Sequence, residues 1–535
     1  MAAFDEVETS DPHRAYETGS RNLVANVYET LLDIDPAAGG LRPKLASLSP
    51  SNSAADEPVY RFRIRPGVLF HDGSKLTTDD VVYSLRRLLL LGTGAGVFWR
   101  EALLGRSAAN PARRDLVAAA ERIWAEGDTV VVTLPLPYSP FLQLVATYAY
   151  ILPAAWCVRA GDWSGSLDEA PPEHWASAVG ETANGTGPYR LASWDRSDRT
   201  LRFRRFADYW GLPPLVEHIV YTSIDDRLTR EAALVEGKVD FAVCQGESLS
   251  RLRHGDGIHV AESSADWSVN PLGLLSFDLA HDADFLGSGE FSPSGMPSDA
   301  LRDPHLRAAL SHCFDHDRFE REALGGRGIR HHGLFPRTAL PGGPRPANRY
   351  DLALARKHLE KAAGGAVKKN GVRIVSYTHR GNLARERAAK ILADGFNRLQ
   401  PSARLEVRAT TLQDLMDRLE GRRCPIGWIG WASDFCHPHA SVSPFLSSAW
   451  PLARGLSITS PGTEAAVEAA LRSQDETAAG RIYQQLARTI VDERLMLFVP
   501  SKVNYRVYRS SWSGIDFVGG RPNVLDFARF RWNTS

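Results

Sequence analysis

The sequence predicts an α/β protein that folds as two or three lobes. Its 535 residues are long for a single hydrophobic core, and chains of this length usually divide into domains. Hydrophobic residues make up 43% of the chain, which is typical of folded globular proteins. A strand pattern and a helix pattern follow each other between Tyr60 and Arg87, so both kinds of element are expected.

A strand and two turns are predicted at the start of this segment. Tyr60, Phe62 and Ile64 alternate with three arginines, the period of two that marks a strand with one buried face. The pairs Pro66–Gly67 and Asp72–Gly73 favour turns on either side of a short apolar run. We therefore expect a strand, a turn, a second short strand and another turn.

A capped helix is predicted after the second turn. Thr77 is a suitable N-cap, and Asp79 and Asp80 follow in the first turn, where the helix dipole favours negative charge. Apolar residues then recur on one face at helical spacing over Val81–Leu88. The segment as a whole is an ordered α+β unit.

Charge and hydropathy exclude several classes of protein. The chain has 63 basic and 63 acidic residues, so we expect no electrostatic attraction to nucleic acid or to anionic lipid. It has no run of about eighteen apolar residues, so no transmembrane segment is expected. The N-terminal segment MAAFDEVETSDPHRAY is acidic and lacks the apolar region of a secretory signal. A periplasmic or extracellular protein whose signal is not present in this sequence and a cytoplasmic protein therefore both remain open.

The cysteines do not identify the redox compartment. There are five, an odd number, so at least one thiol has no intramolecular disulfide partner. Cys424 and Cys436 are close enough in sequence to pair, but we expect isolated buried thiols.

The segment Tyr60–Arg87 resembles the family 5 solute-binding proteins of ABC importers, which include receptors for oligopeptides, dipeptides and nickel. The family signature is an aromatic strand, then L-R-x-G-V-x-F-H-D-G, then L-T-x-x-D-V-x-x-S. The chain matches nearly every position, with Ile64–Arg65 in the place of Leu-Arg. A match of this length is far more specific than one short motif.

Shorter matches extend the resemblance over almost the whole chain and become looser in the second half. The G-T-G-P-Y motif of the family is matched by Gly185–Tyr189. The other matched segments are Asp11–His13, Tyr28–Glu29, Arg42–Ala46, Gly237–Asp240, Leu306–Leu310 and Tyr350–Leu359.

The resemblance implies a periplasmic-binding-protein-like fold of type II. In this fold two lobes are joined by a hinge, and members of cluster C carry an extra α+β insert domain. The implied domains are lobe I at 1–47, 186–267 and 502–535, the insert with the signature at 48–185, and lobe II at 268–501.

The same resemblance implies a hinge, and composition predicts two loops. Crossover strands near Gly185–Tyr189 and Val499–Val503 would allow the lobes to close over a ligand. The stretches 281–300 and 338–349 are rich in Gly, Ser and Pro and are expected to be loops.

The segment Ile426–Leu446 is the best candidate for the ligand site. It resembles the family motif G-W-x-x-D, which places Trp431 and Asp434 on the family's Trp and Asp. In the peptide receptors of the family this Asp binds the N-terminal ammonium of the ligand, and a buried ammonium does need an ionised partner. Trp428, Trp431 and the adjacent Ala432 would line the site, with the indoles as apolar or cation–π walls.

A structural interpretation of this segment stays open. The Trp-x-x-Trp spacing also suits core packing, and Asp434 also suits the cap of a turn. The family resemblance favours the ligand site.

The same segment departs from the family pattern at Cys436–His439, where relatives carry an acidic residue before the proline. A thiol and two imidazoles near an Asp are soft metal ligands, which makes Cys436, His437 and His439 candidates. Their spacing does not resemble a closed zinc site, so we expect no metal and no cofactor. The departure also weakens the transfer of any particular ligand from relatives.

Three further residues are candidates for ligand contacts. His379 and Arg380 follow a predicted strand where some relatives place a cation that meets a ligand carboxylate, and Arg suits this task through its two-pronged guanidinium. A solvated pair at the strand end is the alternative. Glu29 matches an acidic position that lines the cleft in peptide receptors, and an ordinary glutamate at a helix end is the alternative.

The function implied by the resemblance is that of a binding protein. We expect a monomeric receptor that closes over a peptide-like solute and delivers it to the permease subunits of an ABC importer. A metal chelate, an opine or a sugar conjugate is an alternative ligand, and a ligand-sensing domain of an intracellular regulator is an alternative function. No catalytic constellation supports an enzyme.

Overall fold

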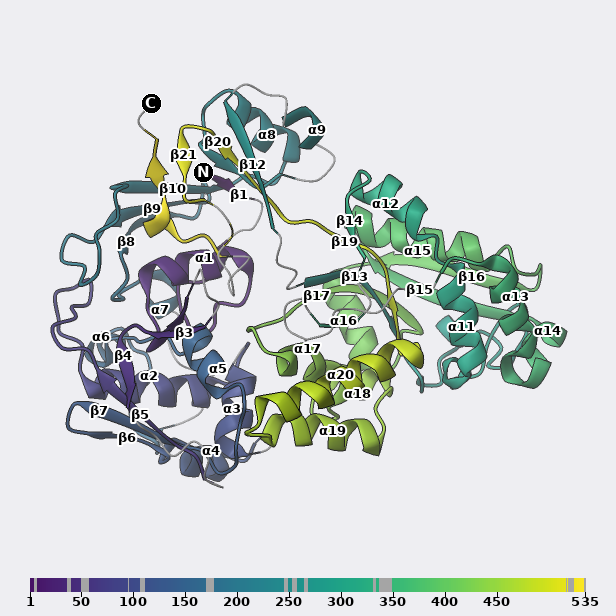
Figure 1. The fold of residues 1–535 in the computed structure, drawn as a ribbon, viewed down its shortest axis with the longest axis horizontal. Coiled ribbons are helices and arrows are strands. Elements are labelled where there is room, and N and C mark those ends of the chain that lie inside the picture. Colours follow the sequence, from purple (N-terminus) through teal and green to yellow (C-terminus); the bar gives the residue numbers. More distant parts are fainter. Residues whose placement is uncertain are drawn as a thin grey trace. The chain divides into compact units, whose positions relative to one another are not determined.

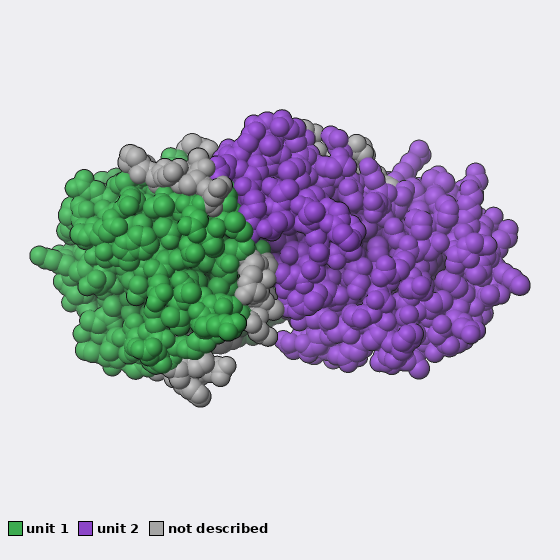
Figure 2. Space-filling view, turned by 90° about the horizontal axis from the view of Figure 1, so that it is seen from below, with its two compact units in different colours: residues 1–263, 504–535 green, residues 264–503 purple. Residues whose placement is uncertain are grey.

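The computed structural model forms two compact units, which Figure 2 shows in different colours. Unit 1 comprises Met1–Ser263 and Asn504–Ser535, and unit 2 comprises Ser264–Val503. The residues that the structure describes are 1–3, 7–35, 40–49, 57–94, 96–105, 111–169, 178–244, 249–252, 257–263, 268–330, 333–335, 349–515, 517 and 524–533.

The two units correct one part of the hinge prediction. Gly185–Tyr189 lies inside unit 1, so the prediction that the chain crosses between the lobes at this motif is wrong. The chain passes between the units after Ser263 and again after Val503, and the second passage adjoins the predicted segment Val499–Val503. The finer division of unit 1 into a lobe and an insert stays a prediction.

Unit 1 contains a seven-stranded sheet and a four-stranded sheet (Figure 1). The larger sheet has the order β12 (Ile258–Glu262), β20 (Tyr505–Arg509), β11 (Phe241–Ala242), β1 (Ala2–Ala3), β10 (His218–Ser223), β9 (Thr200–Arg205) and β8 (Tyr189–Asp195). The smaller sheet has the order β4 (Ala46–Ser49), β5 (Val59–Ile64), β7 (Thr129–Thr133) and β6 (Ile123–Glu126). Two strand pairs complete the unit: β2 (Leu32–Ile34) with β3 (Leu41–Pro43), and β21 (Trp512–Ser513) with β22 (Arg531–Trp532).

The helices described in unit 1 connect these strands. They are α1 (Thr18–Val27), α2 (Thr78–Leu91), α3 (Gly96–Leu104), α4 (Arg113–Ala120), α5 (Phe141–Tyr148), α6 (Ala154–Arg159), α7 (Ala178–Glu181), α8 (Arg227–Val235), α9 (Leu249–Leu252) and the 3₁₀ turn η5 (Phe527–Arg529).

The strand and the capped helix predicted between Tyr60 and Arg87 are confirmed. Side chains of β5 alternate, with Tyr60, Phe62 and Ile64 buried. Thr77 is the N-cap of α2, and it forms a capping box with Asp80 in which each side chain accepts a hydrogen bond from the other residue's backbone N–H. The predicted second short strand is present only as an isolated antiparallel β-bridge between Leu69 and Lys75.

His71 of this segment joins it to the G-T-G-P-Y motif. Its Nδ1 accepts a hydrogen bond from the Gly185 N–H at 3.3 Å, so Nε2 carries the proton and donates to the Gly187 carbonyl at 2.9 Å. Burial lowers the pKa of His71 to about 4, which keeps the ring neutral at pH 7. Gly185 is required because a Cβ there would lie 2.1 Å from the Val27 carbonyl oxygen.

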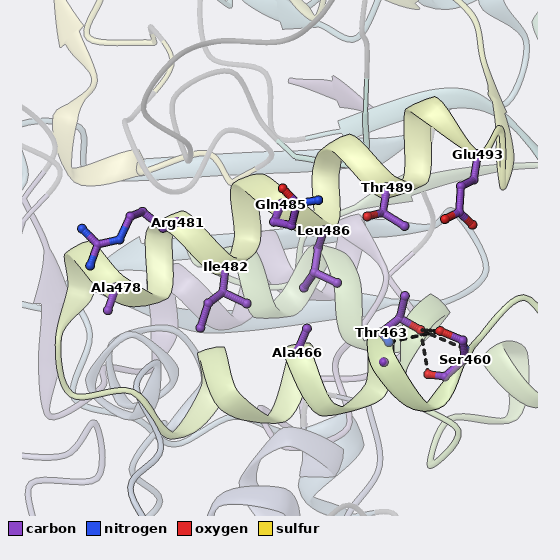
Figure 3. Close-up of a pocket in the computed structure, with 11 residues that line it drawn as sticks. Ser460, Thr463, Ala466, Ala478, Arg481, Ile482, Gln485, Leu486, Thr489 and Glu493 are labelled. Atoms are coloured by element: carbon purple, nitrogen blue, oxygen red, sulfur yellow. Dashed lines mark hydrogen bonds between the residues drawn. The ribbon is translucent and has the colours of Figure 1, made fainter.

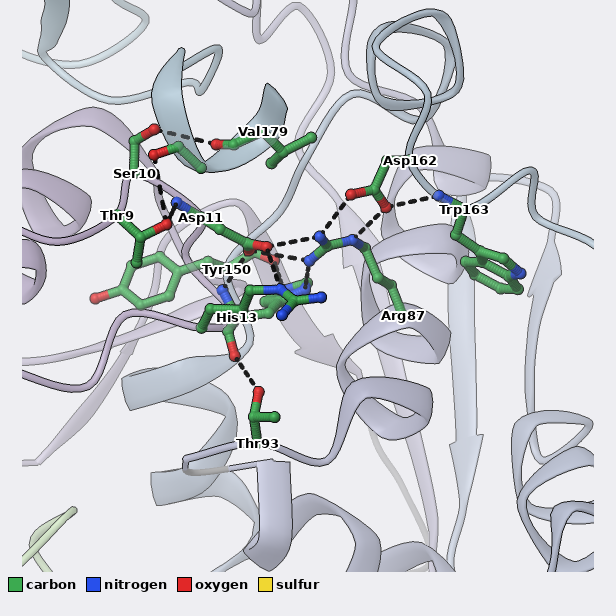
Figure 4. A network of polar contacts seen from close by, with 12 residues as sticks. Thr9, Ser10, Asp11, His13, Arg87, Thr93, Tyr150, Asp162, Trp163 and Val179 are labelled. Atoms are coloured by element: carbon green, nitrogen blue, oxygen red, sulfur yellow. Dashed lines mark hydrogen bonds and ion pairs between the residues drawn. The ribbon is translucent and has the colours of Figure 1, made fainter. Parts of the chain in front are cut away.

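Arg87 on α2 forms a buried ionic network that Figure 4 shows. Its guanidinium donates to Asp11 at 2.7 Å and to Asp162 at 2.8 Å. Burial opposes ionisation of Asp11, but Arg87 and His13 outweigh it and lower the pKa of this carboxyl. His13 accepts from Arg87 through Nδ1 at 3.1 Å, and burial and the guanidinium lower its pKa to about 4. The network thereby fastens the N-terminal segment and the segment after α6 to α2.

Unit 2 is built around a five-stranded sheet with the order β16 (Ala403–Thr410), β15 (Val372–His379), β17 (Ile426–Ala432), β13 (Ser268–Leu275) and β18 (Met496–Phe498). β15 is parallel to β16 and β17, whereas β13 is antiparallel to β17 and β18. β14 (Gly328–Ile329) pairs with β19 (Ser501–Lys502). The helices are α10 (Ala283–Leu286), η3 (Ala300–Arg302), α11 (Pro304–Cys313), α12 (His316–Leu324), α13 (Leu352–Lys361), η4 (Ala362–Gly365), α14 (Ala366–Asn370), α15 (Leu383–Phe396), α16 (Leu412–Glu420), α17 (Pro438–Leu446), α18 (Pro451–Leu456), α19 (Pro461–Arg472) and α20 (Glu476–Asp492).

Of the two predicted loops, one is partly confirmed and the other lies almost entirely outside the described residues. The stretch 281–300 contains the short helix α10 and is otherwise loop, while 338–349 lies outside the described residues except for Arg349. Within the described part of the chain no single helix is long and apolar enough to cross a membrane. α2 and α3 together have sufficient length and composition, but they are bent by 99° at the break between them.

Candidate functional site

The predicted site residues of unit 2 lie at the carboxyl edge of its parallel strands. His379 ends β15 and is paired with Thr410 at the end of β16. Thr378 is paired with Trp428 of β17, which continues to Ala432. Ligand sites of open α/β sheets lie at this edge, because the loops that follow the strands carry side chains free of the ladder.

Asp434 lies directly after β17 and is only 5% exposed. It precedes α17, which begins with Pro438 at its first turn. Beside it, the hydroxyls of Ser433 and Ser441 are hydrogen-bonded at 2.5 Å, which holds the turn onto the helix. A carboxylate this buried retains little bulk water, so it favours a charged or strongly donating partner.

Trp431 and Ala432 form the end of β17. The Trp431 indole is half-buried, and its Nε1 donates to the Ala440 carbonyl at 3.4 Å. Its ring meets the Phe445 ring edge-on, with centroids 5.1 Å apart. Ala432 is exposed. Trp431 is thus fixed in orientation by α17 and keeps part of its surface open.

Trp428 does not share this position. Its side chain is completely buried in the core of unit 2, with the ring near Phe314 and the Nε1 donating to Ser376 Oγ at 3.0 Å. The structural interpretation of the Trp-x-x-Trp spacing therefore holds for Trp428, because successive residues of a strand alternate between its faces and only one ring reaches the edge. We do not retain Trp428 as a ligand contact.

Three basic side chains lie at the end of β15 and just after it. Arg380 is exposed, its backbone N–H donates to the Thr410 carbonyl at 2.8 Å, and its guanidinium has no partner within the described residues. Burial and the neighbouring Arg385 lower the pKa of His379, so its imidazole is neutral at pH 7. Arg385 in the first turn of α15 is itself desolvated, and this burial lowers its pKa to about 10.

Sequence reasoning missed Arg385. Nothing in the spacing of N-L-A-R-E-R distinguishes the half-buried Arg385 from the exposed Arg387 two residues later. The signal lies in the helix that begins after Asn382, whose first turn directs this side chain back toward the strand end.

Buried hydroxyls add polar capacity to this region. Thr378 Oγ1 and Ser443 Oγ are both inaccessible, and neither has a hydrogen-bond partner among the described residues. Unsatisfied buried polar atoms are rare in folded proteins and mark places where a water or ligand completes the bonding.

The Cys–His segment has a structural use. His437 is the N-cap of α17, where its Nδ1 accepts from the His439 N–H at 3.2 Å. Burial and the neighbouring His439 lower the pKa of His437 to about 3, so the ring stays neutral. None of the five cysteines, all of them within the described residues, is in a disulfide, and Cys436 is partly exposed. Within the described ranges no cluster of three or more His, Cys, Asp or Glu residues is arranged to hold a metal ion.

Glu29 belongs to unit 1 and has internal partners. Its carboxylate is inaccessible and accepts hydrogen bonds from Thr186, Tyr209 and Trp210 at 2.9, 2.9 and 2.7 Å. Lys44 Nζ lies 3.6 Å away. These contacts use both oxygens, so we leave Glu29 out of the proposed ligand contacts.

A separate groove lies between α19 and α20 of unit 2, with Ala466, Ile482 and Leu486 in its lining (Figure 3). It contains none of the predicted site residues. We assign no role to it.

Comparison with known proteins agrees with this architecture. The family model of the bacterial extracellular solute-binding proteins, family 5 Middle, matches residues 40–451, well over half of the chain. Protein XP55 of Streptomyces lividans is 24% identical over 93% of this chain and 81% of its own length. The glutathione-binding protein GsiB of Pectobacterium atrosepticum is 22% identical over 92% of this chain and 86% of its own.

Solved structures show the same fold. The periplasmic binding protein DppA of Helicobacter pylori, in complex with the peptide STSA, has a TM-score of 0.77 and 18% identity. The match covers 100% of this chain and 97% of that one. The predicted α/β fold of type II periplasmic binding proteins is thereby confirmed. Together with the matched profile, this shows that the chain belongs to the bacterial extracellular solute-binding proteins, family 5.

Proposed function

We propose that this solute-binding protein is a receptor for a peptide-like small solute, which it binds at the carboxyl edge of β15 and β17 and delivers to the permease of an ABC importer. The observation that carries the proposal is Asp434, a carboxylate 5% exposed in the loop that directly follows β17. A carboxylate in this position can form a charge-assisted hydrogen bond with a ligand ammonium.

The same edge offers groups for the other end of a peptide. Arg380 and Arg385 follow β15, and a guanidinium binds a carboxylate through two parallel hydrogen bonds. A ligand with an ammonium and a carboxylate therefore matches the two charge types of the edge. His379, neutral at pH 7, would supply a hydrogen bond without adding charge.

Relatives with peptide ligands are consistent with this proposal, and other structural neighbours were solved with Fe(III)-EDTA and with agropinic acid. One relative is named a glutathione-binding protein, and one structural neighbour was solved with the peptide STSA. At 22% and 18% identity these names do not fix the ligand of this chain, and the Cys436–His439 departure lies next to Asp434. A metal chelate or an opine would need a different balance of charges at the edge.

The test is calorimetric titration of the purified full chain with a ligand found by native mass spectrometry of the protein as isolated. For a peptide ligand, acetylating its amino group or changing Asp434→Asn should each weaken binding at least about 100-fold, since a desolvated charge pair is lost. The matched control is Asp299→Asn, an exposed carboxylate of unit 2, which should bind as the parent does.

Two results would overturn the proposal. One is unchanged affinity in Asp434→Asn while thermal stability is also unchanged, which removes the assigned contact. The other is a co-purified ligand with no amino group, such as a chelate or an opine-like acid, which removes the solute class.

A further inference from the structure

The loop between β9 and β10 of unit 1 presents two leucines to solvent. Leu212 is 92% exposed and Leu215 is 66% exposed, the two highest values among the large apolar side chains described. Single exposed leucines are common on proteins, but two in one short loop form a small exposed apolar patch.

This exposure does not come from a loose loop. The Pro214 carbonyl accepts a hydrogen bond from the Arg205 guanidinium at 3.1 Å. On the other side, Trp210 donates to Glu29 at 2.7 Å and lies under the Arg65 guanidinium, 4.4 Å from its ring centroid. Two consecutive prolines between the leucines further restrict the backbone. These contacts and the two prolines therefore restrain the loop that exposes the two leucines.

A row of basic side chains, called the cation row after its two arginines, begins at the base of the same loop. Arg190, Arg204 and His218 are directly opposite each other on β8, β9 and β10, neighbouring strands in Figure 1. Arg204 and His218 are each 66% exposed, and Glu217 lies 3.9 and 3.8 Å from them. Arg190 and Arg204 are like charges on directly opposite residues, an arrangement that destabilises a sheet. An external anion near this row would relieve the repulsion.

We propose that this loop and the cation row form a contact surface for an anionic phospholipid bilayer. The leucines would enter the apolar boundary of the bilayer, while the arginines meet lipid phosphates. Exposed leucines and arginines of the same hairpin match this boundary, where an apolar layer adjoins phosphates. Leucine is also under-represented among the residues that dominate protein interfaces. The formal net charge of zero gives no long-range attraction, so the contact depends on this local arrangement.

The experiment is co-sedimentation of the full chain with vesicles. Phosphatidylcholine vesicles are compared with vesicles containing about one third phosphatidylglycerol, at low and high salt. The parent should bind the anionic vesicles more tightly. Changing both leucines to serine (Leu212→Ser and Leu215→Ser) should reduce that binding at least about tenfold, because buried apolar area is lost. Changing Arg190→Gln and Arg204→Gln should remove the preference for anionic vesicles.

Matched controls use exposed residues elsewhere. Leu228→Ser with Leu412→Ser replaces two leucines that are 56% and 45% exposed, and Arg404→Gln with Lys357→Gln removes two exposed charges from unit 2. Both double variants should bind vesicles as the parent does. The inference is overturned if the parent binds neither kind of vesicle, which would leave the leucines to a protein partner, or if the control pairs weaken binding as much as the test pairs.

Discussion

His71 shows how one side chain can hold two distant motifs in register. The ring accepts a hydrogen bond from Gly185 on one nitrogen and donates to Gly187 from the other. Both bonds need the neutral tautomer, since a proton on Nδ1 would face the Gly185 N–H. The histidine of the family signature is therefore a structural residue of unit 1.

This requirement predicts a pH dependence of stability. The pKa of His71 is about 4 in the folded chain, against 6.5 when unfolded, so the unfolded state binds more protons below pH 6.5. Stability from this group is complete above pH 6.5 and is lost as the pH falls toward 4. The loss is on the order of 3 kcal/mol for His71 alone.

The measurement is the urea midpoint between pH 7.5 and 4.5. His71→Gln should lower stability at pH 7.5 and show a weaker pH dependence than the parent. An unchanged slope in His71→Gln would contradict the assignment.

Among the candidate site residues, sequence and structure contribute differently. The position of Asp434 follows from a motif, because the spacing from a strand to the loop after it is local. Trp428 and Glu29 are buried by partners from distant segments, such as Ser376 and Trp210, which no local pattern reveals. Arg385 was missed because the desolvation of its side chain comes from the packing of the folded unit, which the sequence spacing does not show.

At the scale of elements, α2 is joined to two other segments of unit 1 by the buried guanidinium of Arg87. The helix was predictable from its cap and its apolar face. Its arginine at position 87 was not, because its partners Asp11 and Asp162 lie in segments far away in sequence. Two-residue strands such as β1 and β11 were equally unpredictable, since their pairing comes from neighbours in the sheet.

Removing the buried guanidinium should be costly. Arg87→Leu leaves two carboxylates without their cation in a desolvated place, and such losses cost about 3–5 kcal/mol of unfolding free energy. Arg63→Gln, which breaks an exposed pair with Asp128, should cost at most about 1 kcal/mol. Chemical denaturation of both variants at pH 7.5 tests this. Equal, small losses would show that the network contributes little.

At the scale of the whole molecule, length and motifs predicted several lobes and the family, and both units have a buried core of their own. The crossover at Gly185–Tyr189 was mispredicted because that motif packs within unit 1. Net charge likewise describes the molecule only as an average. It gave no indication of the cation row on β8, β9 and β10.

Separate cores predict separate unfolding. Scanning calorimetry of the ligand-free chain should resolve two transitions, because cooperativity follows each core. Arg87→Leu should lower only the transition of unit 1, and Leu392→Ala, in the core of unit 2, only the other. A single transition that both variants shift equally would refute this independence.

The bonds from His71 to Gly185 and Gly187 have a consequence for classification. The residues by which this chain resembles its family include ones that close a joint within the scaffold of unit 1. A sequence match that rests on this segment therefore identifies the scaffold and leaves the solute open. On the function proposed above, the solute would be inferred from the loops after β15 and β17 instead.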